Sequence, residues 1–257
     1  SVSSVFTTPY SSVSSHSYAG GIAGYNSGTI SNCYNIGSVS SAFTAPYSSV
    51  SSHSYAGGIA GYNSDKGTFS NCYYWEATHN GVCVGSDTTT RCTFEQLKSQ
   101  ETFVGFDFDT VWELVEGNAY PFPTLQTVPH GGEDGIENTT EFAGGTGTLY
   151  NPYRIANKAH LNNVRKYLDA HFLMVTDIVF TEADFTEGGA FYNDGQGWEP
   201  IGTDSSKPFF GSFDANGHTV TGLYCYLSGS GVQYAGLFGY NQGFIQNLGL
   251  VDGNISV

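Results

Sequence analysis

Along this chain, apolar and small residues alternate with polar ones over short stretches that begin and end at Gly or Asn. Residues 28–34, GTISNCY, show the pattern clearly. A period of two places successive side chains on opposite faces of a strand, and it does not fit a helix. Gly and Asn supply turns, because both tolerate a left-handed backbone. The pattern therefore predicts many short strands joined by tight turns.

The alternating stretches belong to repeats. Residues 1–27 return at 38–64 with two substitutions, and a third, diverged copy spans residues 234–250. Duplicated units without a helix between their strands predict parallel strands, stacked about 4.8 Å apart along one axis. The predicted fold is all-β, a parallel β-helix or β-solenoid.

Equivalent residues of stacked copies would lie directly above one another. An Asn at such a position tolerates the turn, and its amide can bond its neighbour in the next copy. Two ladders are therefore predicted, and Tyr25, Tyr62 and Tyr240 would stack beside the first of them. The ladder residues are Asn26, Asn63 and Asn241 in one row and Asn32, Asn71 and Asn247 in the other.

Two of the five cysteines lie in one polar loop. Cys83 and Cys92 bound the stretch VCVGSDTTTRC, which is long enough to fold back on itself. We expect a disulfide between them and hence an oxidising compartment, with two free thiols as the alternative.

The other cysteines have a different context. Cys33 and Cys72 occupy matching repeat positions, where the third copy carries Leu248, and this favours inward-facing apolar packing. Together with Cys225 they are predicted to be buried free thiols. A Cys33–Cys72 bridge or metal site is the alternative, although no further ligands stand at conventional spacing.

Several segments resemble the GLUG repeats of bacterial and archaeal surface proteins. They are GGIAGYNSGTISNCYNIGSVS (20–40), its second copy and AGLFGYNQGFIQNLGLVDGNIS (235–256). GTGTLYNPYRIANKAHLNNV (145–164) is similar to the segment that opens such modules, and residues 71–75 and 106–126 to the segment that closes them. The resemblance implies a right-handed β-helix in an extracellular scaffold or adhesive region.

On this resemblance the chain divides into three parts. Residues 1–127 are the C-terminal part of a GLUG β-helix module, made of repeats 1–37 and 38–75 and a closing segment, 76–127. Residues 128–143 are an acidic, Gly-containing linker. Residues 144–257 are the N-terminal part of a module that would continue into a copy of 1–127.

The opening segment thus follows the closing segment. The sequence that results from joining residue 257 to residue 1 reads much like the internal junction at 35–43. We therefore expect the C-terminal coil to be followed directly by an N-terminal coil, either in a covalent tandem array or by end-to-end stacking of separate chains.

Two short helices are predicted as covers for the stack. Residues 157–170 place Leu161, Val164 and Leu168 at helical spacing, which suits a helix over the first coil. A capping box opens a second helix, at residues 93–98. Such covers are needed because an open coil is an edge strand that invites another chain.

Composition limits the classes of partner. The chain has 8 Lys+Arg against 23 Asp+Glu, a formal charge of -15, and would repel nucleic acid and anionic membranes. No apolar run approaches the roughly 20 residues that span a bilayer. We expect an extracellular structural or adhesive protein, one period of a filament or tandem surface array, whose partners are copies of itself and cell-surface or host glycans or proteins.

Candidate chemistry is sparse, and no catalytic residue and no cofactor are predicted. A β-helix that binds or cleaves carbohydrate is one alternative, and the scaffold region of a larger secreted peptidase-type protein is another. Calcium is the alternative to a cofactor-free chain, at Asp107/Asp109 or at Glu133, Asp134 and Glu137, although neither group has a specific calcium-loop pattern. The carboxylate pairs considered are Asp107/Asp109, Asp184/Glu187, Asp194/Glu199 and Asp204/Asp214.

Two further features concern the outside of the stack. The duplicated loop places aromatic residues among serines, and we expect them to form an interaction ridge on one side. The ridge residues are Phe6, Tyr10, Phe43 and Tyr47. Asn138 and Asn254 satisfy the N-glycosylation sequon.

Overall fold

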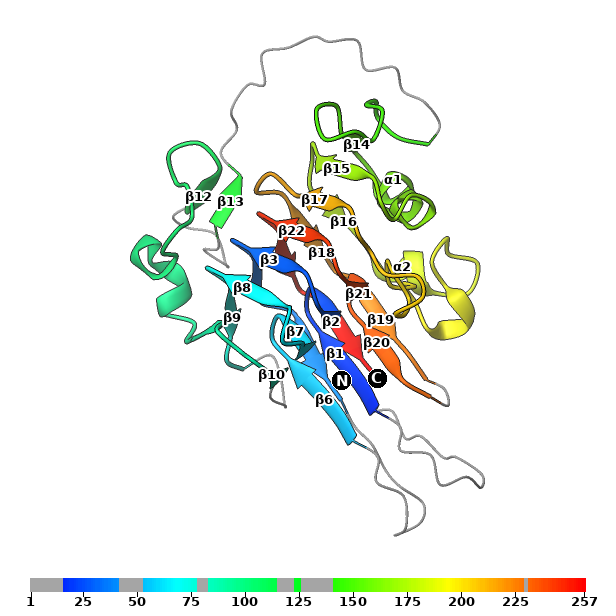
Figure 1. The fold of residues 1–257 in the computed structure, drawn as a ribbon, viewed down its shortest axis with the longest axis horizontal. Helices are drawn as coiled ribbons and strands as arrows, with labels where there is room; N and C mark the ends of the chain where they lie inside the picture. The colour runs from blue at the N-terminus through cyan, green and yellow to red at the C-terminus, as the bar shows by residue number, and fades with distance from the viewer. Residues whose placement is uncertain (1–15, 42–52, 78–82, 115–122, 126–140, 229–230) are drawn as a thin grey trace.

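The computed structural model describes residues 16–41, 53–77, 83–114, 123–125, 141–228 and 231–257. This part of the chain consists mostly of strands with a few short helices, so the protein is all-β. Its strands form six sheets, of which all but the β12–β13 pair are parallel. Figure 1 shows these strands side by side along one direction of the molecule.

Sheets I, II and III are parallel sheets of three, four and six strands. Sheet I has the order β20–β1–β6, with β20 (Gln233–Ala235), β1 (His16–Gly20) and β6 (His53–Gly57). Sheet II has the order β10–β7–β2–β21, with β10 (Val84–Gly85), β7 (Ala60–Asn63), β2 (Ala23–Asn26) and β21 (Phe238–Asn241). Sheet III has the order β14–β15–β17–β22–β3–β8, with β14 (Tyr153–Ile155), β15 (His171–Met174), β17 (Ser212–Asp214), β22 (Phe244–Gln246), β3 (Thr29–Ser31) and β8 (Thr68–Ser70).

The remaining sheets complete the set. Sheet IV has the order β11–β9–β4–β23–β18–β16, with β11 (Thr90–Cys92), β9 (Tyr73–Trp75), β4 (Tyr34–Asn35), β23 (Gly249–Val251), β18 (Thr219–Thr221) and β16 (Ile178–Val179). Sheet V has the order β19–β24–β5, with β19 (Tyr224–Tyr226), β24 (Asn254–Ser256) and β5 (Ser38–Ser40). The antiparallel pair is β12 (Trp112–Leu114) with β13 (Pro123–Leu125).

Each sequence repeat enters these sheets in the same order. The first repeat, together with β5 directly after it, contributes β1 to β5 to sheets I to V in turn, and the C-terminal repeat contributes β20 to β24 in the same way. The second repeat contributes β6 to β9 to sheets I to IV. Equivalent residues of different copies are therefore direct neighbours, as in His16 opposite His53.

The turns between sheets are made by residues that can adopt an unusual backbone. Asn32, Asn71 and Asn247 join sheets III and IV with φ of 48°, 52° and 55°, the left-handed region that Asn tolerates. Gly20 lies at the turn from sheet I to sheet II, where an added Cβ would come within 1.9 Å of the Ala23 carbonyl oxygen. A larger residue at Gly20 would force this turn open.

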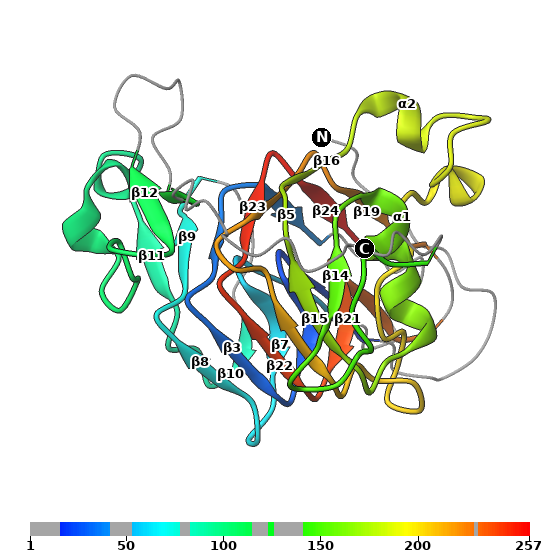
Figure 2. The same cartoon turned by 90° about the horizontal axis from the view of Figure 1, so that it is seen from above.

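The main core lies between the five parallel sheets, whereas β12 lies to one side of them (Figure 2). The alternating pattern explains its content, because every second residue of a strand points inward. In sheet III the inward residues form an in-register column, which contains Phe172, Phe213, Ile245, Ile30 and Phe69. All of these but Phe69 are buried, whereas their neighbours on the same strands are partly or fully exposed.

A second core lies outside the first, against the outer face of sheet IV. Tyr34 and Tyr73 point away from the main core and are covered by the closing segment, through Phe103, Phe106 and Trp112. The segment also contains two 3-10 helices, η1 (Gln96–Lys98) and η2 (Gln100–Thr102). The closing segment therefore packs on the flank of the stack.

The opening segment carries the remaining helices. α1 (Lys158–Asn163) is capped by the Asn157 side chain and runs into η3 (Val164–Lys166). The expected helix over 157–170 is thus too long, because the Leu168 carbonyl accepts the backbone N–H groups of Phe210 and Gly211. Two further helices, α2 (Glu182–Phe185) and η4 (Asn193–Gly195), lie beyond β16.

The predicted helix at residues 93–98 is a single 3-10 turn, η1. Its capping box is present: the Thr93 hydroxyl accepts the Gln96 N–H at 3.2 Å, and the Gln96 side chain accepts the Thr93 N–H at 2.8 Å. The bonds satisfy backbone donors at the start of the turn.

The C-terminal repeat meets the first repeat within one chain. In sheets I to V the strands β20 to β24 pair directly with β1 to β5. Within this chain the pairing is intramolecular, and the expected contact between consecutive units or separate chains stays a prediction. The two parts of the chain thereby cover each other's edge strands.

The expected Cys83–Cys92 disulfide is wrong, since both cysteines are free. Cys83 directly precedes β10, which joins sheet II, whereas Cys92 ends β11, which joins sheet IV. The loop does not fold back on itself because its two ends extend different sheets. Cys33, Cys72 and Cys225 are also buried free thiols.

Replacing Ile245 with Ala should lower the free energy of unfolding by about 2–5 kcal/mol, because it leaves a cavity in the sheet III column. The matched control is Phe244→Ala on the same strand, where the side chain is 61% exposed. It should change the free energy by less than about 0.5 kcal/mol. Urea unfolding followed by circular dichroism measures both, and equal losses would contradict the assigned faces.

The five cysteines should resist thiol reagents in the folded chain. Burial raises the pKa of Cys83 to about 12, of Cys92 to about 11 and of Cys225 to about 12, so little thiolate exists at pH 8. A chromogenic disulfide reagent at pH 8 should react with none of them before unfolding and with all five in denaturant. Fewer than five thiols in denaturant, restored by prior reduction, would instead reveal a disulfide.

Candidate functional site

The stacked side chains between copies are the most regular polar feature of the molecule. Asn241 donates its amide N–H to the Asn26 side-chain oxygen at 2.9 Å, and Asn26 donates to Asn63 at 2.8 Å. Asn63 then donates to the Ser86 carbonyl at 2.7 Å. These three Asn side chains are almost fully buried, at 0%, 0% and 2% exposure. The row therefore satisfies polar groups that would otherwise be costly to bury.

A second row lies at the turn between sheets III and IV. Asn71 donates to Asn32 at 3.0 Å, Asn32 to Asn247 at 3.2 Å, and Asn247 to the Asp214 carboxylate at 3.0 Å. Gly105 of the closing segment lies against Asn71, where an added Cβ would come within 2.0 Å of the amide nitrogen. The row thus runs from the closing segment to the Asp214 carboxylate at the end of β17.

Aromatic side chains stack beside the first row. The Tyr25 ring lies 4.1 Å from that of Tyr240 and 5.0 Å from that of Tyr62, centroid to centroid, in nearly parallel planes. Tyr18 stacks in the same way between Tyr55 and Tyr234, at 5.6 and 5.7 Å. Tyr25 and Tyr18 each have a neighbouring ring on both faces, so neither of these two rings is free to stack on a bound sugar.

The tyrosine stack also affects ionisation. Burial, together with the neighbouring phenols of Tyr234 and Tyr55, raises the pKa of Tyr18 to about 12. Further out along the same strands, the His16 and His53 rings stack at 5.6 Å. The Tyr18 phenol is therefore neutral at physiological pH and acts as a packing group.

The carboxylates considered for catalysis have separate structural partners. Asp184 pairs with Lys158 at 2.6 Å and Glu199 with Arg165 at 2.9 Å. Burial raises the pKa of Asp184, but Lys158 and the Thr181 bonds outweigh it and hold the pKa below its usual range. Asp214 ends the second Asn row. These groups stabilise turns, caps and ladders.

Two further candidates of this set, Asp204 and Asp107, hold turns. Asp204 accepts the backbone N–H of Ser206 at 2.7 Å, and its pKa is lowered by the Ser206 hydroxyl and backbone. Asp107 accepts the backbone N–H groups of Asp109 and Thr110 at 2.9 Å each, and bonds to Thr110 lower its pKa. Both carboxylates thus hold their own loop.

Metal binding has little support in the described part of the chain. No group of three or more His, Cys, Asp or Glu there could hold a metal ion. Asp107, proposed for calcium, uses its oxygens for the turn, and Asp109 lies beside it. Glu133, Asp134 and Glu137 lie outside the described residues.

The predicted interaction ridge and one of the two glycosylation sequons fall outside the described part of the chain. The ridge residues Phe6, Tyr10, Phe43 and Tyr47 lie outside the described residues, as does Asn138. Asn254 begins β24, the middle strand between β19 and β5, and it is half-buried. A glycan on Asn254 would therefore have to project from the middle strand of a three-stranded sheet.

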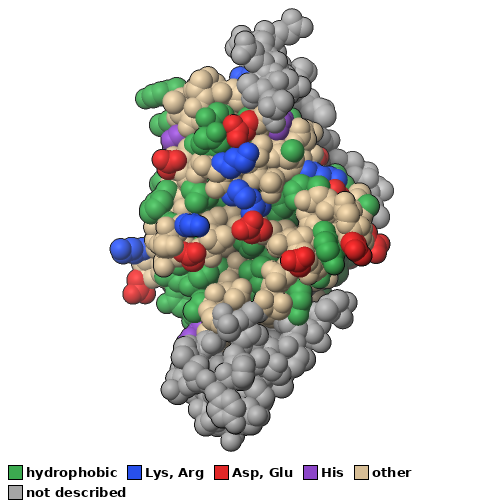
Figure 3. Space-filling view, turned by 90° about the vertical axis from the view of Figure 1, so that its right-hand side faces the viewer, with side chains coloured by type: hydrophobic (Ala, Val, Ile, Leu, Met, Phe, Trp, Pro, Cys, Tyr) green, Lys and Arg blue, Asp and Glu red, His purple; other side chains and the backbone are tan. Residues whose placement is uncertain are grey.

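The face that carries α1 and α2 has mixed charge (Figure 3). Lys158, Arg165 and Lys166 each pair with an acidic side chain, the last with Glu141 at 3.1 Å. The Arg165 guanidinium also lies 4.8 Å from the Trp198 ring. Each of these basic groups is therefore paired with an acidic side chain of the same chain, and the three do not form a free anion site.

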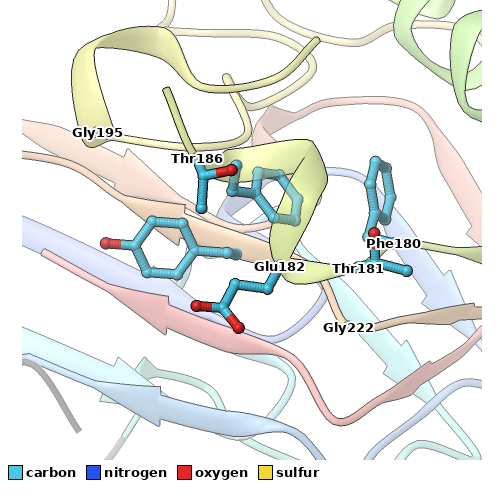
Figure 4. Close-up of a pocket in the computed structure, with 8 residues that line it drawn as sticks. Phe180, Thr181, Glu182, Thr186, Gly195 and Gly222 are labelled. Carbon is cyan, nitrogen blue, oxygen red and sulfur yellow. The ribbon is translucent and has the colours of Figure 1, made fainter. Parts of the chain in front are cut away.

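A groove of about 450 Å³ opens beside α2. Its apolar floor contains Phe180 and Phe185, whose ring centroids are 5.3 Å apart, and Glu182 and Thr186 lie at its margin (Figure 4). Sequence reasoning missed this groove, because α2 is a single turn whose only signal is the Thr181–Asp184 capping box. The lining residues are Phe180, Thr181, Glu182, Phe185, Thr186, Gly195, Gly222 and Tyr224.

Replacing Asn26 with Leu should destabilise the chain, because Asn241 and the Gly28 N–H would lose a buried acceptor. Each unsatisfied buried group costs about 1–3 kcal/mol. The control is Thr29→Val, since the Thr29 hydroxyl bonds Thr68 at an exposed position where water can replace it. Thermal and urea unfolding measure both variants, and an Asn26→Leu chain as stable as the control would contradict the role of the buried row.

Comparison with known proteins agrees with the repeated architecture. Residues 15–40 match the GLUG motif. A Gly-rich membrane protein of Evansella cellulosilytica is 40% identical over 127 residues, which cover 48% of this chain and 14% of that protein. Halomucin of Haloquadratum walsbyi is 30% identical over 181 residues, which cover 66% of this chain and 2% of that protein.

The chain thus corresponds to a small part of each of these relatives. No solved structure matches it. Among the helices of the described residues, none has the length and hydrophobicity to cross a membrane. The motif match covers β1 to β5, and residues 38–64 repeat residues 1–27 with two substitutions. The chain therefore contains a GLUG-repeat region.

Proposed function

We propose that this chain is a parallel β-helix region that serves as a structural, non-catalytic part of a large extracellular surface protein. The observation that carries the proposal is the direction of the buried amides. Asn241 donates to Asn26 and Asn26 donates to Asn63 in the neighbouring copy, and the Asn63 amide donates to the Ser86 backbone carbonyl, so these amides bond protein groups and not a ligand-binding cavity. In other proteins such amide side chains line binding sites. In this chain they connect one repeat to the next.

The β-helix part of the proposal rests on the strand order. Each repeat passes through sheets I to IV in sequence, and adjacent repeats pair in parallel and in register. A right-handed coil is the expected sense, because parallel crossover connections are nearly always right-handed. Each coil needs its neighbours to bury its faces, so the architecture suits extended scaffolds.

The surface role is supported by the relatives and by charge. Both relatives are much longer than this chain, and the name of one describes a membrane protein. A net charge of -15 disfavours nucleic acid and anionic lipid surfaces as partners. We propose that repeated regions of this kind act as spacers or adhesive segments outside the cell, and that copies of the region follow one another in tandem.

A carbohydrate-binding role is the second candidate, and the groove beside α2 favours it. Its aromatic floor and the Glu182 carboxylate offer apolar contact and a hydrogen-bond acceptor. Phe185 is only 9% exposed, however, so little of its ring is free for a sugar. We therefore place this role second.

The proposal is tested on the purified chain and on intact cells of its source. Antibodies raised against the chain should label unpermeabilised cells, and a panel of surface polysaccharides should show no new reducing ends after incubation with it. Labelling only after permeabilisation would contradict the location. Polysaccharide turnover that Glu182→Gln abolishes, while Glu187→Gln leaves it unchanged, would overturn the non-catalytic role.

A further inference from the structure

The contact between the C-terminal repeat and the first repeat, called the seam here, joins two parts of the chain that are distant in sequence. We propose that the same seam also forms between two copies of this chain, so that β20–β24 of one copy pair with β1–β5 of another. The inference rests on the proposed β-helix and names its partner. It makes the region a self-associating module by strand exchange.

The seam is a continuous interface. It consists of five parallel strand pairs in register: β1 with β20, β2 with β21, β3 with β22, β4 with β23 and β5 with β24. Inside it, Ile30 faces Ile245 and Val39 faces Ile255, and these side chains are at most 1% exposed. Backbone pairing and core burial thus both cross the seam.

The seam resembles the contact between repeats that follow one another along the chain. Asn26 bonds Asn241 across the seam at 2.9 Å and Asn63 of the next repeat at 2.8 Å. The Tyr25 ring lies 4.1 Å from Tyr240 across the seam and 5.0 Å from Tyr62. The geometry of the seam therefore does not depend on covalent continuity between the strands that meet there.

Exchange between copies would keep every one of these contacts. The two sides of the seam, residues 16–125 and 141–257, are connected in sequence only through residues 126–140. A copy that opens at the seam exposes the backbone groups of β20–β24 and of β1–β5, which a second opened copy can satisfy with the same partners. Closed pairs or open chains result, depending on whether the exchange is reciprocal.

The net charge of the chain determines how strand exchange depends on salt. Each copy carries a net charge of -15, so association brings like charges together and is opposed at low ionic strength. Exchange should therefore increase with protein concentration and with salt. A tandem surface array would favour it further, because neighbouring copies are held at high local concentration.

Three variants of the full chain, each with one added cysteine, test the proposal. Thr29 lies opposite Phe244 across the seam and opposite Thr68 within the same side of it. Neighbouring parallel strands lie about 4.8 Å apart, within reach of a short thiol crosslinker. The native cysteines are buried and do not compete. The variants are Thr29→Cys, Phe244→Cys and Thr68→Cys.

The first measurement mixes Thr29→Cys with Phe244→Cys, refolds them together and crosslinks them. A covalent dimer that increases with protein concentration and salt is expected, because these positions meet in different copies only through exchange. The matched control mixes Thr29→Cys with Thr68→Cys. It should give no dimer, since those positions always meet within one copy.

The second measurement crosslinks the double variant Thr29→Cys/Phe244→Cys in dilute solution, where it should yield an intramolecular bridge. A bridge here with no dimer in the first mixture, at any concentration or salt, would overturn exchange and leave the proposed β-helix intact. If the double variant forms neither an intramolecular bridge nor a dimer, while circular dichroism shows a folded chain, the strand order itself fails and the proposed function fails with it.

Discussion

The in-register stacking of equivalent residues is the constraint on which the rest of this structure depends. A strand alternates its side chains between two faces, so a slip of one residue would turn Ile30 outward and Thr29 into the core. The hydrophobic pattern alone penalises that slip. The buried Asn row adds a polar penalty, because Asn26 meets both of its amide partners only when Asn241 and Asn63 stand directly beside it. Apolar and polar interactions therefore specify the same register.

Much of the repeat architecture could be predicted from sequence because its signals are local. Alternation gives the strands, and Asn at the ends of GTISN and its counterparts marks turns that the structure forms with positive φ at Asn32 and Asn71. The capping box at Thr93 and Gln96 is equally local. In each case the residues involved interact with near neighbours or with their own copies in the next repeat, so a repeated pattern reveals them.

Features that depend on distant partners were not predictable. The spacing of Cys83 and Cys92 permits a bridge, but strand pairing draws them to different sheets. Tyr34 stands at an outward position, where alternation predicts exposure, yet it is fully buried because the closing segment covers it. The third copy has Gly249 opposite Tyr34, and an added Cβ there would lie 2.5 Å from the ring. Only the assembled fold explains that glycine.

The hydrogen bonds of the two Asn rows run in opposite directions along the stack. In the buried row the donors point from Asn241 toward Asn63. In the second row, at the turn between sheets III and IV, they point the opposite way, from Asn71 toward Asp214. An amide can be turned end for end, so a row of identical amides has no preferred polarity by itself. A carboxylate only accepts hydrogen bonds, and Asp214 therefore makes one polarity the favoured one for every amide behind it. A single anion thus orients Asn247, Asn32 and Asn71 together, across a boundary where the polypeptide is not continuous.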